Sequence, residues 1–170
     1  MKRIIVIGSG GAGKSTFSRR LSKCLNINSV HLDVHFWHAG WIETEQSIWK
    51  EKVKDLVKAD SWIIDGNFGS TLDIRLDACD TVIFLDMPRF LCMWRIVKRF
   101  FMYRKRTRPD LAEGCFEKID LEFIKWVWNF KNNGRLRILE KLENYSRAKR
   151  VVHLKSRKEV ESFFEKIKAD

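Results

Sequence analysis

Long apolar runs, prolines and paired cysteines are all scarce in this chain of 170 residues. No apolar run approaches the roughly 20 residues that a membrane-spanning helix needs, and only residues 4–7 form an apolar stretch ahead of Gly8. We therefore expect neither a membrane span nor a secretory signal. Only 2 prolines, Pro88 and Pro109, interrupt the chain. The 4 cysteines lie far apart without zinc or redox spacing, which is typical of a reduced cytoplasmic protein.

Acidic residues are also in deficit, because 22 Asp and Glu stand against 33 Lys and Arg, and the formal net charge is +11. This excess favours anionic partners such as nucleotides, nucleic acid or an acidic surface, without choosing among them. A hydrophobic fraction of 45% and a charged fraction of 32% exclude disordered, collagenous and low-complexity proteins. At this length we expect a single domain over residues 1–170.

What the chain does contain is an alternation of short apolar runs with longer segments of helical period. This pattern is typical of an α/β protein with a parallel sheet. The predicted strands span residues 3–7, 29–32, 62–64, 81–85 and 151–154. The predicted helices span residues 14–25, 45–58, 89–103, 121–130, 136–145 and 157–168. Residues 104–115 contain Pro109 and Gly114 and break the helical pattern, so we expect a mobile loop there.

The clearest motif lies directly after the first predicted strand, where residues 8–15 read G-S-G-G-A-G-K-S. This spacing matches the phosphate loop of nucleotide-binding proteins, in which glycines let backbone N–H groups turn towards a phosphate. Lys14 is placed to reach the β- and γ-phosphates, and the Ser15 hydroxyl to ligate Mg²⁺. A plain glycine turn is the alternative, but the strand–loop–helix context disfavours it. The expected phosphate-binding residues are Gly8, Ser9, Gly10, Gly11, Ala12, Gly13, Lys14, Ser15 and Thr16.

With this loop, two further elements resemble the P-loop kinases of the adenylate kinase-like group: a D-G-N-F run at residues 65–68 and an R-I-V-K-R run at residues 95–99. More narrowly, the D-G-N-F run, H-L-D-V-H-F-W-H-A-G-W at residues 31–41 and R-T-R-P-D at residues 106–110 look most like the DNA topology modulation protein family. The resemblance implies a P-loop NTPase fold, with a five-stranded parallel sheet of order 2-3-1-4-5 flanked by helices. It also implies use of ATP and Mg²⁺, an acceptor-side flap at about residues 34–60 and a small lid at about 104–115.

Two carboxylates follow predicted strands at the edge of the sheet that holds the phosphate loop. Asp65 corresponds in the resemblance to the residue that orients the metal's water, and Asp33 to an acidic residue beside the acceptor, as general base or orienting group. The alternative for each is a helix cap or turn former. His31, Asp33 and His35 alternate, so an extended chain would place them on one face, where a wall of the acceptor pocket is favoured over a zinc site.

The segment that follows is rich in aromatic residues and poor in arginine. Trp37 and its neighbours are suited either to stack a base or sugar or to fill the core beneath a flap. The adenylate kinase pattern D-G-F-P-R ends in an arginine that grips the acceptor's phosphate, but here Gly69 stands at that position. Arg75 is the candidate substitute. Without an arginine that holds a phosphate through two hydrogen bonds at that position, the case for a phosphorylated acceptor is weaker. The expected acceptor-binding residues are Asp33, His35, Trp37, Asn67 and Arg75.

Residues 95–108 hold seven basic side chains and no acidic one. The resemblance gives Arg95 a position against the adenine face and Arg99 a contact with the transferring phosphoryl group. Three further arginines are expected to close over the site as a lid, namely Arg104, Arg106 and Arg108. Two residues that follow the last strand, Ser156 and Arg157, are expected to lie beside the base.

The same basic helix has two other interpretations, a solvated face and a nucleic-acid patch. Two observations argue against nucleic-acid binding: we expect Phe100, Phe101 and Tyr103 to face the core, and no DNA-reading motif is visible. The sequence therefore predicts a cytoplasmic kinase without a membrane partner, using Lys14, Arg99 and Asp33 in catalysis. It predicts a nucleoside monophosphate or nucleotide-like acceptor. A small unphosphorylated hydroxyl compound is the alternative acceptor, and an ATP-dependent DNA-associated regulator the alternative function.

Overall fold

The computed structural model describes residues 1–103, 107–118, 120–145 and 148–169. Its helices are α1 (Lys14–Leu25), α2 (Leu32–Phe36), α3 (Gln46–Leu56), the 3₁₀ turn η1 (Gly69–Thr71), α4 (Leu72–Ala78), α5 (Arg89–Tyr103), α6 (Leu121–Asn129), α7 (Gly134–Tyr145) and α8 (Arg157–Ala169). Its strands are β1 (Arg3–Gly8), β2 (Ser29–His31), β3 (Trp37–His38), β4 (Ile42–Glu43), β5 (Trp62–Asp65), β6 (Thr81–Leu85) and β7 (Arg150–Leu154).

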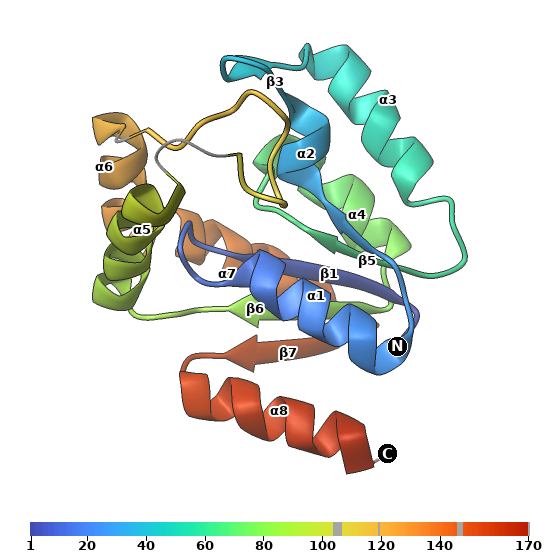
Figure 1. The fold of residues 1–170 in the computed structure, drawn as a ribbon. Coiled ribbons are helices and arrows are strands. Elements are labelled where there is room, and N and C mark those ends of the chain that lie inside the picture. Colours follow the sequence, from blue (N-terminus) through green and yellow to red (C-terminus); the bar gives the residue numbers. More distant parts are fainter. Residues whose placement is uncertain (104–106, 119, 146–147, 170) are drawn as a thin grey trace.

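The central sheet has five parallel strands in the order β2-β5-β1-β6-β7 (Figure 1). Strand β1 is central because its apolar residues are buried on both faces, which is the pattern of a strand covered by helices on two sides. Counting only the strands of this sheet, the order is 2-3-1-4-5, so the predicted fold is confirmed.

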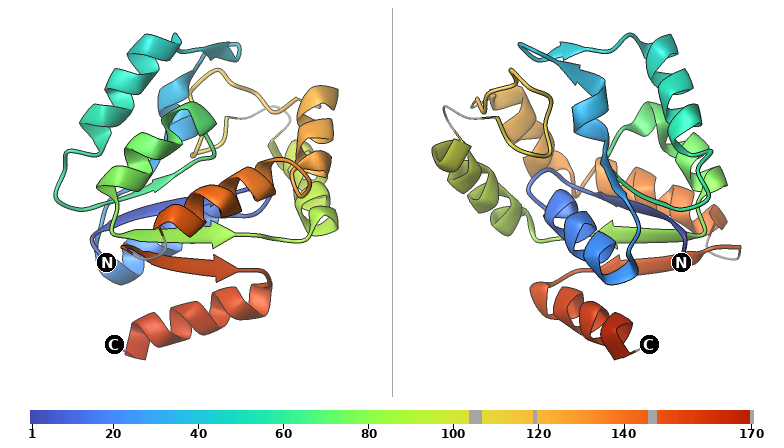
Figure 2. Two further views of the ribbon diagram at one scale, coloured as in Figure 1. Left: turned by 180° about the vertical axis from the view of Figure 1, so that it is seen from behind. Right: turned by 45° about the vertical axis from the view of Figure 1, so that its right-hand side comes forward.

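Helices cover both faces of the sheet and bury separate cores. On one face, α3, α4 and α7 pack around Trp49 and Leu76, while on the other α1 and α8 pack through Phe17 and Phe164. Seen from behind, α4 and α7 lie in front of the strands, whereas α1 lies on the opposite side (Figure 2). Helices α5 and α6 stand at the carboxyl edge of the sheet, where the phosphate loop lies (Figure 1).

Two parts of the acceptor-side region were not expected from the sequence. The segment after β2 turns at once into the short helix α2 and then forms an antiparallel hairpin of β3 and β4. Helix α4, seven residues long, follows η1. In the described parts of the chain, no helix combines the length and apolarity required to cross a bilayer.

Candidate functional site

The phosphate loop joins β1 to α1 and adopts a backbone that its glycines permit. Gly11 and Gly13 have φ angles of 73° and 98°, in the left-handed region that side chains disfavour. A Cβ atom on Gly11 would also lie 2.3 Å from the carbonyl oxygen of Cys92 in α5. The loop is therefore built against α5, and its path depends on glycine at this position.

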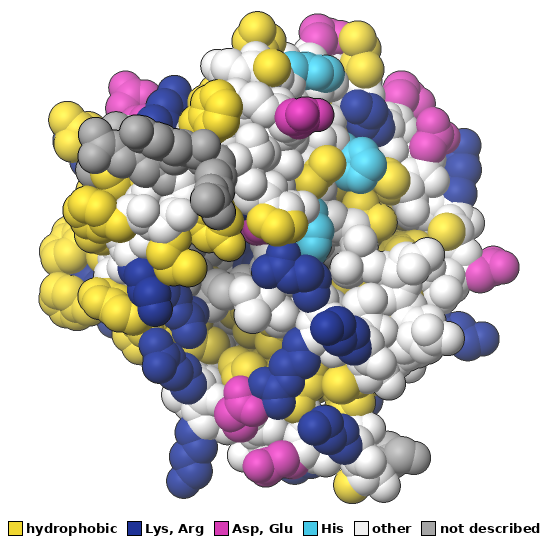
Figure 3. Space-filling model, in the orientation of Figure 1, with side chains coloured by type: hydrophobic (Ala, Val, Ile, Leu, Met, Phe, Trp, Pro, Cys, Tyr) yellow, Lys and Arg dark blue, Asp and Glu magenta, His cyan; other side chains and the backbone are white. Residues whose placement is uncertain are grey.

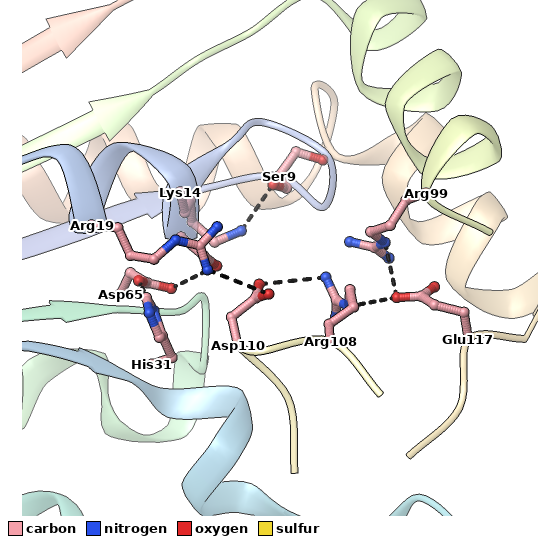
Figure 4. Close-up of polar contacts among 10 residues, drawn as sticks. Ser9, Lys14, Arg19, His31, Asp65, Arg99, Arg108, Asp110 and Glu117 are labelled. Atoms are coloured by element: carbon pink, nitrogen blue, oxygen red, sulfur yellow. Dashed lines mark hydrogen bonds and ion pairs between the residues drawn. The ribbon is translucent and has the colours of Figure 1, made fainter. Parts of the chain in front are cut away.

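Lys14 begins α1 and curls back over the loop. Its ammonium donates to the carbonyl oxygens of Gly8 at 3.0 Å and Ser9 at 2.9 Å (Figure 4). Burial lowers the pKa of Lys14, although the carboxylates of Asp33 and Asp65 act in the opposite direction. The cation thus lies at the mouth of the loop, close to both predicted acidic residues.

Ser15 and Asp65 lie together as the motif predicts. The Ser15 hydroxyl donates to Asp65 Oδ1 at 3.3 Å, because Asp65 ends β5 beside the strand that leads into the loop. Hydroxyl and carboxylate oxygens are the ligands that Mg²⁺ prefers, so this pair fits the metal. Among the described residues, no three His, Cys, Asp or Glu side chains are grouped to hold a metal. A Mg²⁺ bound partly by substrate phosphates needs only one or two protein carboxylates.

The other oxygen of Asp65 contacts His31, which ends the neighbouring strand β2. His31 Nδ1 lies 2.5 Å from Asp65 Oδ2. Burial of the ring acts to lower the pKa of His31, but the hydrogen bond and negative charge of Asp65 outweigh it, and the pKa is raised. This imidazole holds the carboxylate in place. The register β2–β5 pairs the two residues, so a search of neighbouring strand ends would have found the contact.

The expectation that His31, Asp33 and His35 share one face of an extended chain is wrong. His31 ends a strand, whereas Asp33 and His35 lie in helix α2, where successive side chains no longer alternate. Burial raises the pKa of the Asp33 carboxyl, and the charge of the nearby Lys14 ammonium acts in the opposite direction. The pKa of His35 is lowered by burial and by the nearby Lys52 ammonium.

The aromatic residues of this region divide between core and wall. Trp49 is fully buried and packs edge-on against Phe36 with ring centroids 5.1 Å apart, so it fills the core. Trp37 is half-buried and meets Trp41 edge-on at 5.3 Å. Asn67 follows β5 and is half-buried. Four of the five predicted acceptor residues are half-buried and retain exposed surface, namely Asp33, His35, Trp37 and Asn67.

Arg75 lies elsewhere than a phosphate clamp would. Its side chain is fully buried in α4, and its guanidinium donates to the carbonyl oxygens of Gly66 at 2.9 Å, Phe68 at 2.7 Å and Thr71 at 3.3 Å. Burial lowers its pKa to about 10. The guanidinium thus ties the turn after β5 to α4, and the structure does not bring it to an open acceptor site.

Arg95 lies against the phosphate loop. Its Nη1 donates to the carbonyl oxygens of Ala12 at 2.8 Å and Gly11 at 3.2 Å. Burial and the nearby Arg157 guanidinium lower its pKa, so these two predicted nucleotide neighbours lie near each other. The hydroxyl of Ser156 accepts a backbone N–H from the first turn of α8 at 3.2 Å, and caps that helix.

Arg99 and Arg108 converge on one carboxylate (Figure 4). Glu117 Oε1 lies 3.0 Å from Arg99 Nε and 2.6 Å from Arg108 Nε. A second carboxylate, Asp110, lies 3.5 Å from Arg108 Nη1 and 3.8 Å from Arg19 Nη1. Burial acts to raise the pKa of Asp110, but Arg108 and its other polar neighbours outweigh it, and the pKa is lowered. Sequence reasoning missed both carboxylates, because this segment has no periodic pattern.

The part of the predicted lid that the structure describes is packed rather than free. Leu111 and Cys115 are buried, and the segment is hydrogen-bonded to the β3–β4 hairpin. The donors Gly40 N–H, Trp41 indole N–H and Cys115 thiol reach the carbonyl oxygens of Gly114, Phe116 and His38 at 3.2, 2.9 and 3.0 Å. These contacts differ from the expected mobile loop over residues 107–115. The predicted lid residues Arg104 and Arg106 lie outside the described residues.

The outer side of α5 is more apolar than expected. The prediction that its aromatic residues face the core is wrong for Phe101, which is 70% exposed. Trp94 is 55% exposed, and Lys98 Nζ lies 5.1 Å from its ring centroid. In the space-filling view, hydrophobic side chains gather along the margin that α5 and α6 form (Figure 3).

Comparison with known proteins bears on the whole chain. No protein-family model matches it. A crystal structure of shikimate kinase from Bacteroides thetaiotaomicron is similar, with a TM-score of 0.54 and 19% identity, over 99% of this chain and 97% of that chain. At that identity the likeness concerns the fold. This chain therefore has a P-loop kinase-like fold, similar to that of shikimate kinase.

Proposed function

We propose that this protein is an ATP-dependent small-molecule kinase that transfers the γ-phosphoryl group of ATP to a small acceptor. The observation that carries the proposal is the meeting of Lys14, Ser15 and Asp65 at the phosphate loop, with Arg99 on the helix beside it. Lys14 and the loop amides would hold the phosphates, and Ser15 and Asp65 would hold Mg²⁺. Bound Mg²⁺ would neutralise charge on the phosphate oxygens.

The remaining roles concern the acceptor and the charge that develops during transfer. Negative charge spreads over the phosphoryl oxygens in the transition state, and arginines already in place stabilise it. This is the role proposed for Arg99. Asp33, whose raised pKa makes it a stronger base than an ordinary aspartate, would orient the acceptor hydroxyl or accept its proton.

Two classes of acceptor are proposed, and the buried position of Arg75 favours the second. The family resemblance suggests a nucleoside monophosphate or nucleotide-like molecule. The burial of Arg75 against three carbonyl oxygens instead favours a small hydroxyl compound without a phosphate, because a phosphorylated acceptor is best gripped by an arginine fork.

Phosphorus NMR of transfer from Mg-ATP tests this proposal. The acceptors are nucleoside monophosphates, nucleosides and small polyols, so the product identifies the acceptor class. We expect Lys14→Ala to abolish transfer, and Arg99→Ala to lose most turnover while keeping most ATP affinity. The control is Lys98→Ala, because Lys98 is exposed on the same helix. Wild-type turnover in Lys14→Ala would exclude the kinase.

A second candidate, an ATP-dependent regulator that binds DNA, is favoured by the exposed aromatic and basic side of α5. Contacts with DNA phosphates release counterions, so this candidate predicts binding that weakens steeply with salt and depends on ATP. Trp94→Ala and Lys98→Ala should then reduce DNA affinity. If DNA neither binds at physiological salt nor alters ATP turnover, this candidate is rejected.

A further inference from the structure

We propose that Glu117 is a positioning residue, which holds Arg99 and Arg108 so that both guanidinium groups meet the transferring phosphoryl group. This inference rests on the proposed kinase function. Arg99 comes from α5 and Arg108 from the segment beyond it, so no single element fixes their separation. Glu117 supplies that constraint by charge, because its Oε1 forms ion pairs with Nε of both arginines at 3.0 and 2.6 Å, although these atoms lack hydrogen-bond geometry.

The atoms used in these contacts matter for what is left free. Both ion pairs run through Nε, so the terminal nitrogens of the two arginines remain for other partners. In the close-up, the terminal nitrogens of Arg99 lie towards the side that holds Lys14 (Figure 4). Arg108 Nη1 lies 3.5 Å from Asp110 Oδ2, so a carboxylate oxygen already contacts one terminal nitrogen of Arg108. A phosphoryl group, like that carboxylate, is negatively charged and has oxygen atoms that accept hydrogen bonds.

The electrostatics give Glu117 a reason to be there. Burial, and then the charge of Arg108, lower the pKa of Arg99, whereas Glu117 raises it. The Glu117 side chain is only 4% exposed, so solvent screens these interactions weakly. Without the carboxylate, two buried like charges would repel and separate. With it, the pair keeps one net positive charge directed at the site.

The same contacts are also compatible with an inhibitory role for Glu117. If Glu117 instead held the arginines away from the nucleotide, its removal would raise turnover. The sign of the change in kcat therefore separates positioning from inhibition. A merely structural role would lower thermal stability and leave the kcat of the folded protein unchanged.

The test is a double-mutant cycle of Glu117→Gln with Arg99→Ala, measured as phosphoryl transfer, ATP affinity and thermal unfolding. We expect Glu117→Gln to lower kcat about 10–100-fold, the range for residues that orient a functional group, with little change in the Kd of ATP. Because Glu117 acts partly through Arg99 and partly through Arg108, Glu117→Gln should slow the Arg99→Ala protein less than it slows the wild-type protein. Glu113→Gln is the matched control, since Glu113 is exposed in the same segment.

A second variant covers the case in which Glu117→Gln does not fold. Arg108→Lys keeps the charge but removes the Nε contact, and should lower kcat in the same way. Wild-type or increased kcat in the folded Glu117→Gln protein, or an additive cycle, overturns the inference and leaves the kinase proposal standing. Absence of transfer by the wild-type protein to every acceptor overturns both.

Discussion

Arg75 gives the sharpest prediction at the scale of one residue. Arg75→Met should lower the free energy of unfolding by about 2–4 kcal/mol, because three carbonyl oxygens lose their donor inside the protein. Urea unfolding measures this, and Arg137→Met is the control because Arg137 is exposed. Unchanged stability with a tenfold rise in the KM of the acceptor would instead restore the clamp role that the sequence suggested.

The same residue shows what single positions reveal before a structure is known. Lys14, Ser15 and Asp65 were predictable because a local motif and a strand end determine their neighbours. Arg75 was not, because its partners depend on how α4 packs against the turn after β5. Glu117 was missed for a related reason: its contact with Arg99 joins two segments that only the tertiary fold brings together.

At the scale of elements, the contact between the phosphate loop and α5 leads to a prediction. Gly11→Ala should weaken ATP binding at least tenfold and reduce stability by about 1–3 kcal/mol, since an added Cβ meets the Cys92 carbonyl and φ is positive. Calorimetric titration with Mg-ATP measures the affinity. Gly69→Ala is the matched control, because an added Cβ there meets nothing within 4 Å. Equal affinity in both variants would contradict the role of this contact.

Elements with a regular apolar period or an unbroken apolar run were predictable, whereas short elements without either were not. The bounds of α1, α5 and β6 agree with the sequence prediction, since each buries a regular set of apolar side chains. The five-residue helix α2 and the two-residue strands β3 and β4 are too short to show a period. The acceptor side is built largely from these, which is why its geometry was the least predictable part of the site.

At the scale of the whole molecule, Asp80 joins β1 to β6 and makes stability depend on pH. Its carboxylate accepts the backbone N–H groups of Lys2 and Arg3 at 2.8 Å each and the Thr81 hydroxyl at 2.6 Å. Burial acts to raise the pKa of Asp80, but these hydrogen bonds outweigh it, so the pKa is lowered. The carboxylate therefore stabilises the fold above the unfolded-state pKa, and this contribution is lost as the pH falls through the folded-state value.

Asp80→Asn should accordingly be less stable than the wild-type protein at pH 7, by a margin that narrows as the pH is lowered towards 3. Urea unfolding at a series of pH values gives the comparison. Asp60→Asn, at an exposed position, should follow the wild-type curve throughout. A margin that stays constant with pH would show that the charge of Asp80 is not responsible.

The place of β7 at one edge of the sheet has a consequence for how the chain folds during synthesis. The three inner strands and β2 are complete once β6 has left the ribosome, but β7 and α8 follow 65 residues and more after Leu85. Until then, the free edge of β6 and the side of Phe17 that meets Phe163 and Phe164 stay open to water. A growing chain in this state is exposed to aggregation, and pairing of β7 with β6 ends that exposure.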